Sequence, residues 1–308
     1  MKQKLMKTFA CLALMAASAT LHAQEPKGQP VVTLFGDYHV AEQQMGFNLE
    51  RAYLGYQHSW DEKWTAKVVF DMGKSGDVGD LQRLGYLKNA FVSYKSGGLQ
   101  LNVGLASTEQ FNTQEKHWGY RYVSKSFMDE QKWGSSADLG LSAKYTFAPW
   151  MSADLSIFNG EGYKKLQLDD QLLYGLGLTL HPAKGLTLRA YGELKPAADT
   201  ACQQTLALFA GYKHEHFSLG AEWNMQHNQK NTADKDASGL SLYATGKMGK
   251  RLEAFLRYDN LLSHTQQGIV GLQWKVNKQV SLAPNFRWTK ANDGDDQWAA
   301  YISAKFSL

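Results

Sequence analysis

Apolar and polar residues alternate along almost the whole chain after residue 30. From 31 to 308 the sequence divides into sixteen segments of roughly ten residues, separated by Gly, Asn, Asp, Lys and Pro. In residues 252–259, for example, the even positions are Leu, Ala, Leu and Tyr, and the odd positions are Glu, Phe, Arg and Asp. A period of two indicates a β-strand with one apolar and one polar face. The pattern therefore predicts an all-β chain.

The links between these segments alternate in length. Short links lie near 61–63, 96–98, 148–150, 182–185, 215–216, 248–250 and 277–278, and longer ones near 73–82, 107–136, 160–170, 196–203, 227–237, 261–266 and 291–296. Only the first of the longer class, 41–45, is itself short. Short turns at one rim and longer loops at the other are typical of outer-membrane barrels and are not expected of a soluble sandwich. We therefore predict a transmembrane antiparallel β-barrel of 16 strands (14–18), with short periplasmic turns and longer extracellular loops.

The N-terminus resembles a segment that is removed on export. Three lysines precede a short apolar run at 9–17, and a candidate cleavage site follows Ala23. This is the layout of a secretory signal peptide. We therefore expect a signal peptide at 1–23 and a single barrel domain at 24–308. No later apolar stretch reaches the length of about 18 residues that a membrane-spanning helix needs.

Removal of the signal peptide changes the charge of the chain. The three lysines that leave with it reduce the 33 basic residues to 30, against 29 acidic residues. A nearly neutral mature chain does not carry the basic footprint of a nucleic-acid-binding protein. Cys202 is the only cysteine after residue 23, so no intramolecular disulfide is expected.

Strand parity separates residues that face the lumen from residues that face lipid. Leu176, Trp223, Leu256 and Trp274 are predicted to face the membrane. The predicted pore-lining residues are Arg51, Lys67, Arg189, Glu222, Arg257, Lys275, Arg287 and Lys305. In one interpretation these charges bias ion entry toward anions, because their balance is mildly positive. In the other they form salt-bridge ladders that hold the wall and select nothing. Both interpretations remain open.

The third long link, 107–136, is much the longest. Loops of this length in compact folds usually have a function. It either folds inward as a pore constriction or caps the barrel from outside. The residues predicted to form the constriction are Glu115, Lys116, His117, Arg121 and Lys125. Their charges are mixed, so a constriction built from them would orient solutes without selecting strongly for one sign.

No motif in the sequence indicates an enzyme, a metal site or a cofactor. Neither GxSxG nor HExxH occurs, and the histidines are scattered. Residues 292–296 are acidic but lack the register of a calcium loop, so a solvated turn is the better interpretation. We therefore expect no catalytic residues, no metal site and no cofactor.

Several stretches resemble a known family. Residues 46–56 (GFNLERAYLGY), with 61–64 (DEKW) and 67–71 (KVVFD), resemble an early strand, turn and strand of the phosphate-selective porin O/P family. Later fragments at 87–92, 136–140 and 159–163 are similar, so the resemblance covers about the first half of the mature chain. The resemblance implies a homotrimeric sixteen-stranded porin that passes small anions, phosphate among them.

These observations predict a passive diffusion channel in the bacterial outer membrane. Its expected surroundings are outer-membrane lipid and lipopolysaccharide, and its expected solutes are small hydrophilic molecules and ions. A weak anion preference is expected, because the lumen charges are nearly balanced. The rival prediction is a structural or surface-interaction barrel with a blocked lumen.

Overall fold

The computed structural model describes residues 27–308 except 43, 75–82, 168, 199, 263 and 293. The predicted signal peptide, 1–23, lies outside these residues. The described residues form sixteen strands: β1 (Lys27–Ala41), β2 (Met45–Ser59), β3 (Trp64–Lys74), β4 (Arg83–Ser96), β5 (Leu99–Ser107), β6 (Ala137–Ala148), β7 (Met151–Phe158), β8 (Leu173–Leu180), β9 (Leu186–Lys195), β10 (Gln203–Lys213), β11 (Phe217–His227), β12 (Ala237–Lys247), β13 (Leu252–Leu261), β14 (Thr265–Lys275), β15 (Val280–Ala291) and β16 (Gln297–Ser307). The predicted count of sixteen is confirmed.

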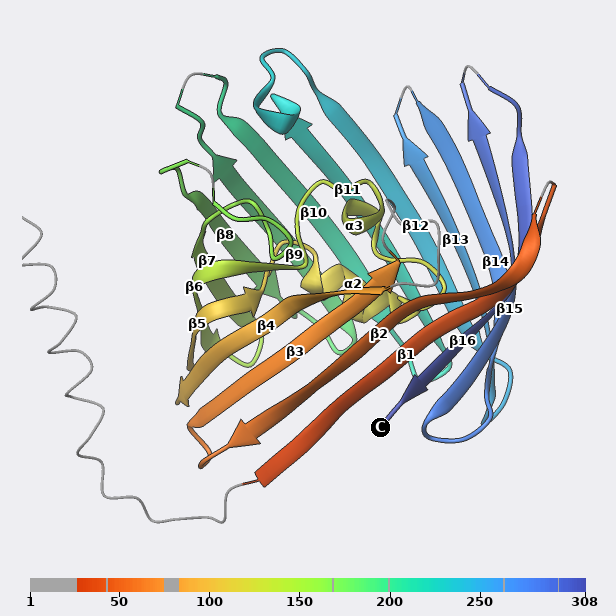
Figure 1. Cartoon of the computed structure of the whole chain (residues 1–308), viewed down its shortest axis with the longest axis horizontal. Helices are drawn as coiled ribbons and strands as arrows, with labels where there is room; N and C mark the ends of the chain where they lie inside the picture. Colours follow the sequence, from red (N-terminus) through yellow and green to blue (C-terminus); the bar gives the residue numbers. More distant parts are fainter. Residues whose placement is uncertain are drawn as a thin grey trace, which may run out of the picture.

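The strands form one closed barrel (Figure 1). Each strand pairs antiparallel with its sequence neighbours, and β1 closes the sheet against β16 from Thr33↔Ser307 to Ala41↔Ala299. Closure pairs the backbone of every strand, which removes the exposed edge that an open sheet would present to lipid. The described residues contain no helix with the length and apolar character needed to cross a bilayer.

The outer surface of the barrel is apolar. Leu176, Leu256 and Trp274 are 62%, 54% and 48% exposed. Trp223 lies on the same surface, since it pairs with the outward Leu208 of β10. The alternation predicted from sequence is therefore confirmed. Near the rims the surface carries exposed aromatic residues, which are typical of the lipid–water interface: Trp60, Trp64, Phe147, Trp150, Trp288 and Trp298.

The two rims differ as predicted, with one exception. One rim, which we call the short-turn rim, carries turns such as 97–98 and 149–150; the other, the long-loop rim, carries 108–136 and 159–172. The link 42–44 at the long-loop rim is short, as predicted, whereas 262–264 is shorter than predicted. The link predicted at 261–266 shrinks because β13 and β14 keep pairing up to Leu261↔Thr265. The predicted end of the pairing was wrong there, and the topology is unaffected.

Candidate functional site

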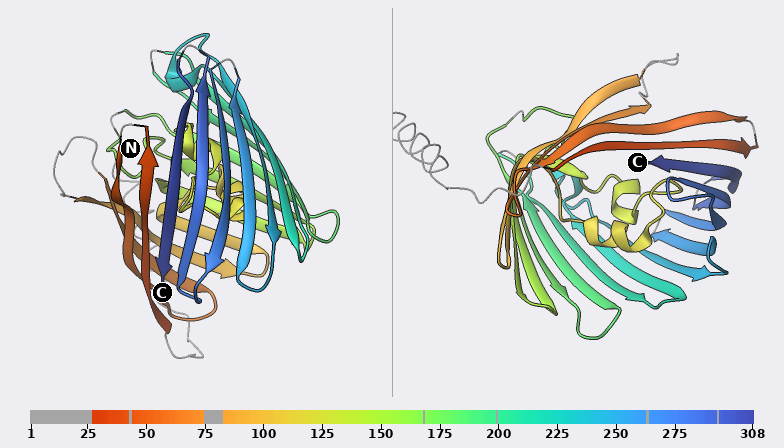
Figure 2. Two further views of the ribbon diagram at one scale, coloured as in Figure 1. Left: turned by 90° about the vertical axis from the view of Figure 1, so that its right-hand side faces the viewer. Right: turned by 90° about the horizontal axis from the view of Figure 1, so that it is seen from below.

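The third loop, 108–136, lies inside the barrel. It contains two short helices, α2 (Asn112–Trp118) and α3 (Phe127–Glu130). Figure 2 (right) shows both helices within the ring of strands, and Figure 1 shows them inside the barrel from the side. This placement favours the constriction-loop interpretation over the external cap.

Hydrogen bonds tie the third loop to strands on one side of the barrel. The Nε2 of His117 donates to the carbonyl of Leu219 on β11 at 2.8 Å. The Tyr122 hydroxyl donates to Oε1 of Gln273 on β14 at 2.9 Å. Burial lowers the pKa of His117 to about 4, so its imidazole is neutral at neutral pH. A neutral imidazole has one N–H, which fits a single carbonyl acceptor.

An aromatic patch on the inner wall holds the same loop. Phe209, Tyr243 and Phe255 occupy lumen-facing positions of β10, β12 and β13 and are almost fully buried. The ring of Trp118 lies 5.2 Å from that of Tyr243, and the ring of Tyr120 lies 4.5 Å from that of Phe255. This patch was not predicted from the sequence. Large aromatic residues on the polar face of three strands were the signal for it.

Arg189 points inward, as predicted, but the third loop covers it. Its guanidinium bonds both oxygens of Asp154 at 2.6 and 2.9 Å. It also donates to Thr179 at 2.8 Å and to the carbonyl of Glu109 in the third loop at 2.9 Å. Only 3% of Arg189 is exposed. It therefore connects the wall to the loop and does not present a free charge to the pore.

Arg257 and Glu222 also lie on the inner wall where the third loop covers it. Arg257 bonds the Asp259 carboxylate at 2.6 and 2.8 Å and also donates to the carbonyl of Lys125. Glu222 lies beside Asn224 and is 4% exposed. The three most buried of the predicted pore-lining residues thus belong to the interface between the wall and the third loop.

Five basic side chains gather where the third loop faces the β2–β4 wall. This basic cluster consists of Arg51, Lys88, Arg121, Lys125 and Lys164. Burial lowers the pKa of Lys164, and the positive charges of Arg51, Lys125 and Lys88 lower it further. Such mutual repulsion requires these groups to lie near one another.

Carboxylates compensate part of this charge. Arg121 donates to Asp129 at 2.7 Å and also to Glu115, and Lys125 lies 4.0 Å from Asp129. Burial raises the pKa of Asp129, but Arg121 and Lys125 outweigh it and hold the pKa below its ordinary value. Two of the predicted constriction charges, Glu115 and Arg121, are therefore bound to each other.

The remaining acid of the cluster is Asp71 on β3. It accepts from Arg51 at 3.1 Å and from the Tyr163 hydroxyl at 2.6 Å. Tyr163 belongs to the neighbouring long loop, 159–172, so a second loop also reaches into the barrel at this point. Among the described residues, three acids form ion pairs with these five bases, so the cluster keeps a positive excess.

Lys88 and Lys164 are the two basic-cluster residues that were not predicted from the sequence, and a local irregularity of β4 explains Lys88. On β4 the pairing jumps from Val69↔Asn89 to Phe70↔Leu87, so Lys88 is the extra residue of a β-bulge. A bulge turns a side chain away from the direction that strict alternation gives it. Lys88 is only 9% exposed and donates to the Tyr53 hydroxyl at 3.2 Å. Parity counting does not find such a residue.

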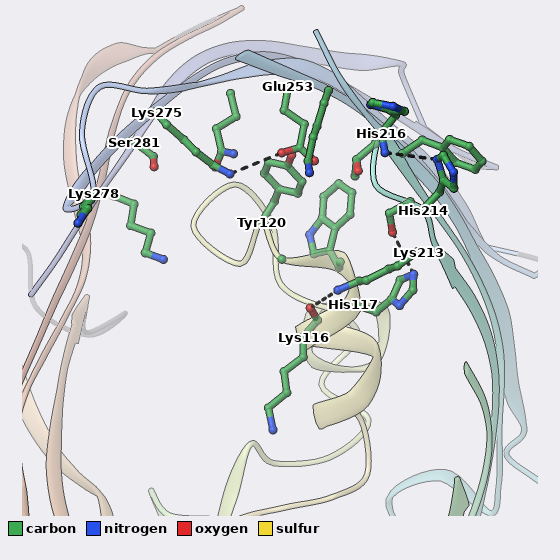
Figure 3. A pocket seen from close by; sticks show the side chains of 18 of the residues that line it. Lys116, His117, Tyr120, Lys213, His214, His216, Glu253, Lys275, Lys278 and Ser281 are labelled. Carbon is green, nitrogen blue, oxygen red and sulfur yellow. Dashed lines mark hydrogen bonds and ion pairs between the residues drawn. The ribbon is translucent and has the colours of Figure 1, made fainter. Parts of the chain in front are cut away.

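The other predicted residues occupy two further places. Lys116, His117, Lys275 and Lys305 line a cavity of about 480 Å³ at the short-turn rim (Figure 3). Arg287 lies over the ring of Tyr301, with its guanidinium carbon 3.9 Å from the ring centre.

Lys67 lies near Lys88, beside the basic cluster. It lies on β3, opposite Gln57 and Phe91, and is partly buried. Among the described residues there is no group of three or more His, Cys, Asp or Glu side chains that could hold a metal ion.

The barrel fold is shared with solved porin structures. An anion-selective porin from Comamonas acidovorans superimposes with a TM-score of 0.70 at 14% identity, over 92% of this chain and 100% of that one. OprB of Pseudomonas putida gives 0.67 at 12% identity, over 91% of this chain and 94% of that chain. The outer-membrane channel DcaP of Acinetobacter baumannii gives 0.65 at 11% identity, over 92% and 97%.

At these identities the comparison establishes the fold. The chain has the architecture of an outer-membrane porin barrel along nearly its full length. No family model and no curated protein matches the chain. The resemblance to the phosphate-selective porin O/P family therefore stays a prediction.

Proposed function

We propose that the protein is an outer-membrane porin: a passive diffusion channel for small hydrophilic solutes and ions. The observation that carries this proposal is the third loop, which narrows a closed barrel and leaves polar cavities beside it. Three of these cavities have volumes of about 480, 410 and 560 Å³ and are lined by residues of the loop and of the wall. The neighbours that share the fold include an anion-selective porin and a channel.

The proposed selectivity is a weak preference for anions. The basic cluster has an excess of positive charge, but Asp71, Glu115 and Asp129 neutralise part of it. A tight phosphate site needs converging donors that carboxylates do not already occupy. Phosphate passage is therefore proposed as modest at this cluster. A homotrimer in the outer membrane, surrounded by lipid and lipopolysaccharide, is proposed as the assembled form.

A second candidate function has one observation in its favour. Tyr122 bonds Gln273 on β14 and also lies 6.3 Å from the ring of Phe35 on β1. The third loop thus contacts β1 in addition to β9, β11, β13 and β14, as expected of a structural barrel with a blocked lumen. The two functions differ in whether ions pass.

Planar-bilayer recording separates them. The purified chain, reconstituted in a bilayer under a salt gradient, should give discrete conductance steps and a small reversal potential on the anion side. Absence of conductance from correctly folded protein would support the blocked barrel. A potential on the cation side would contradict the proposed selectivity.

Lys88 provides a specific variant for this measurement. Lys88→Gln removes a charge from the basic cluster, so the reversal potential should move toward zero. Lys290→Gln removes the same charge from an exposed residue of β15 at the long-loop rim. That control should leave the potential unchanged. Equal shifts in both variants would exclude the basic cluster as the source of selectivity.

A further inference from the structure

The cavity at the short-turn rim has an unusual lining. It lies between the third loop and the ends of β10, β12, β14 and β16. Six lysines line it: Lys116, Lys213, Lys247, Lys275, Lys278 and Lys305. Figure 3 shows Lys213 and Lys275 extending from the wall toward the loop. We call this cavity the lysine vestibule.

Little negative charge compensates these lysines. In the part of the chain that the structure describes, Glu253 is the only carboxylate of the lining, and it lies 3.8 Å from the Nζ of Lys275. Glu215 in the adjacent turn is bound to His216 at 3.2 Å and does not line the cavity. Among the described residues, the other five lysines have no carboxylate within the 4.0 Å of an ion pair. The lysine vestibule therefore differs from the basic cluster, in which the acids hold the bases.

Several uncompensated amines around one cavity repel one another. Low-dielectric walls focus this positive potential into the water of the cavity. A multivalent anion relieves the repulsion at several amines at once, whereas chloride relieves it at one. Ammonium groups on long flexible stems can adjust to such an anion without a fixed geometry.

We propose that the lysine vestibule binds small multivalent anions that carry phosphate or carboxylate groups. It would concentrate them at the short-turn mouth of the barrel. This deepens the proposed function, since it names a solute class and the mouth that holds it. The binding step itself does not depend on conduction, so it can be tested separately.

Calorimetric titration of the folded full-length protein in detergent tests the proposal. The probe is inorganic tripolyphosphate, with chloride and orthophosphate as weaker references. We expect saturable binding of tripolyphosphate that weakens with ionic strength. In the double variant K275Q/K305Q the Kd should rise about tenfold, because two exposed charge pairs are lost.

The matched control is K63Q/K184Q. Both of its lysines are exposed in turns of the same rim and neither lines the vestibule. It removes the same charge and should change the Kd by less than about twofold. Equal weakening in both double variants, or no saturable binding by the unmodified protein, would overturn the proposal. Binding without conductance in bilayers would leave the vestibule standing and refute only the porin function.

Discussion

At the scale of single residues, burial decides which charges serve structure and which can meet a solute. Arg189 and Lys275 both have lumen parity, yet Arg189 is 3% exposed and the Lys275 side chain is 52% exposed. Both terminal nitrogens of the Arg189 guanidinium are engaged, by Asp154, Thr179 and the third loop. Parity gives the direction of a side chain but does not say whether a loop will cover it.

Removal of Arg189 tests this structural role. Arg189→Met should destabilise the protein by about 3–5 kcal/mol, because Asp154 is left charged and buried without its partner. Unfolding by guanidinium, followed by tryptophan fluorescence in lipid vesicles, measures the change. Lys275→Gln is the matched control and should cost less than about 1 kcal/mol, as expected for an exposed pair. Similar costs for the two variants would contradict the assignment.

His117 should make stability depend on pH. Its pKa of about 4 in the folded chain lies below the ordinary value of 6.5, so the unfolded chain binds the proton first as pH falls. The stabilisation is present above pH 6.5 and is lost as pH falls toward 4. Unfolding measured across this range should show a smaller loss in His117→Gln than in the unmodified protein. The same slope in both proteins would remove His117 from this account.

At the scale of elements, alternation predicted the strands well because one constraint governs all of them. A strand in this barrel must present apolar residues to the outside at every second position. The sixteen strands and the third loop at 108–136 follow from that rule and from the link lengths. The rule fails at bulges, which is why Lys88 was missed. It also does not tell a polar lumen position from one that packs against a loop, which is why the patch with Phe255 was missed.

Neighbouring residues of β5 test the orientation of that strand. Val103 is 58% exposed on the outer surface, whereas Asn102 lines an inner cavity. Val103→Arg should cost about 2–4 kcal/mol, because it places a charge in lipid near the middle of the barrel. Asn102→Arg should cost much less, because its charge stays in water. Folding into lipid vesicles measures both, and a larger cost for Asn102→Arg would reverse the assigned faces.

At the scale of the whole molecule, positive charge is distributed unevenly along the axis of the barrel. Five lysines of the lysine vestibule, which form no ion pair with any described residue, lie at or near the short-turn rim. The basic cluster, with its paired carboxylates, lies where the third loop meets β2–β4. Net charge alone, 30 basic against 29 acidic residues after residue 23, suggested a nearly neutral pore. Positive and negative charges nearly cancel in the net charge of the chain, but the fold places them in different regions. The two mouths of the proposed channel therefore differ in charge.

The orientation of this asymmetry in the membrane is the last prediction. Lys230 lies in the exposed link 228–236 of the long-loop rim, and Lys184 lies in a turn of the short-turn rim. In a Cys202→Ser background, Lys230→Cys should react on intact cells with a maleimide attached to a polymer too large for the pore. Lys184→Cys should react only after the outer membrane is opened, because short turns face the periplasm in barrels of this type. The opposite result would place the lysine vestibule at the cell surface, so that it would meet anions entering the cell first.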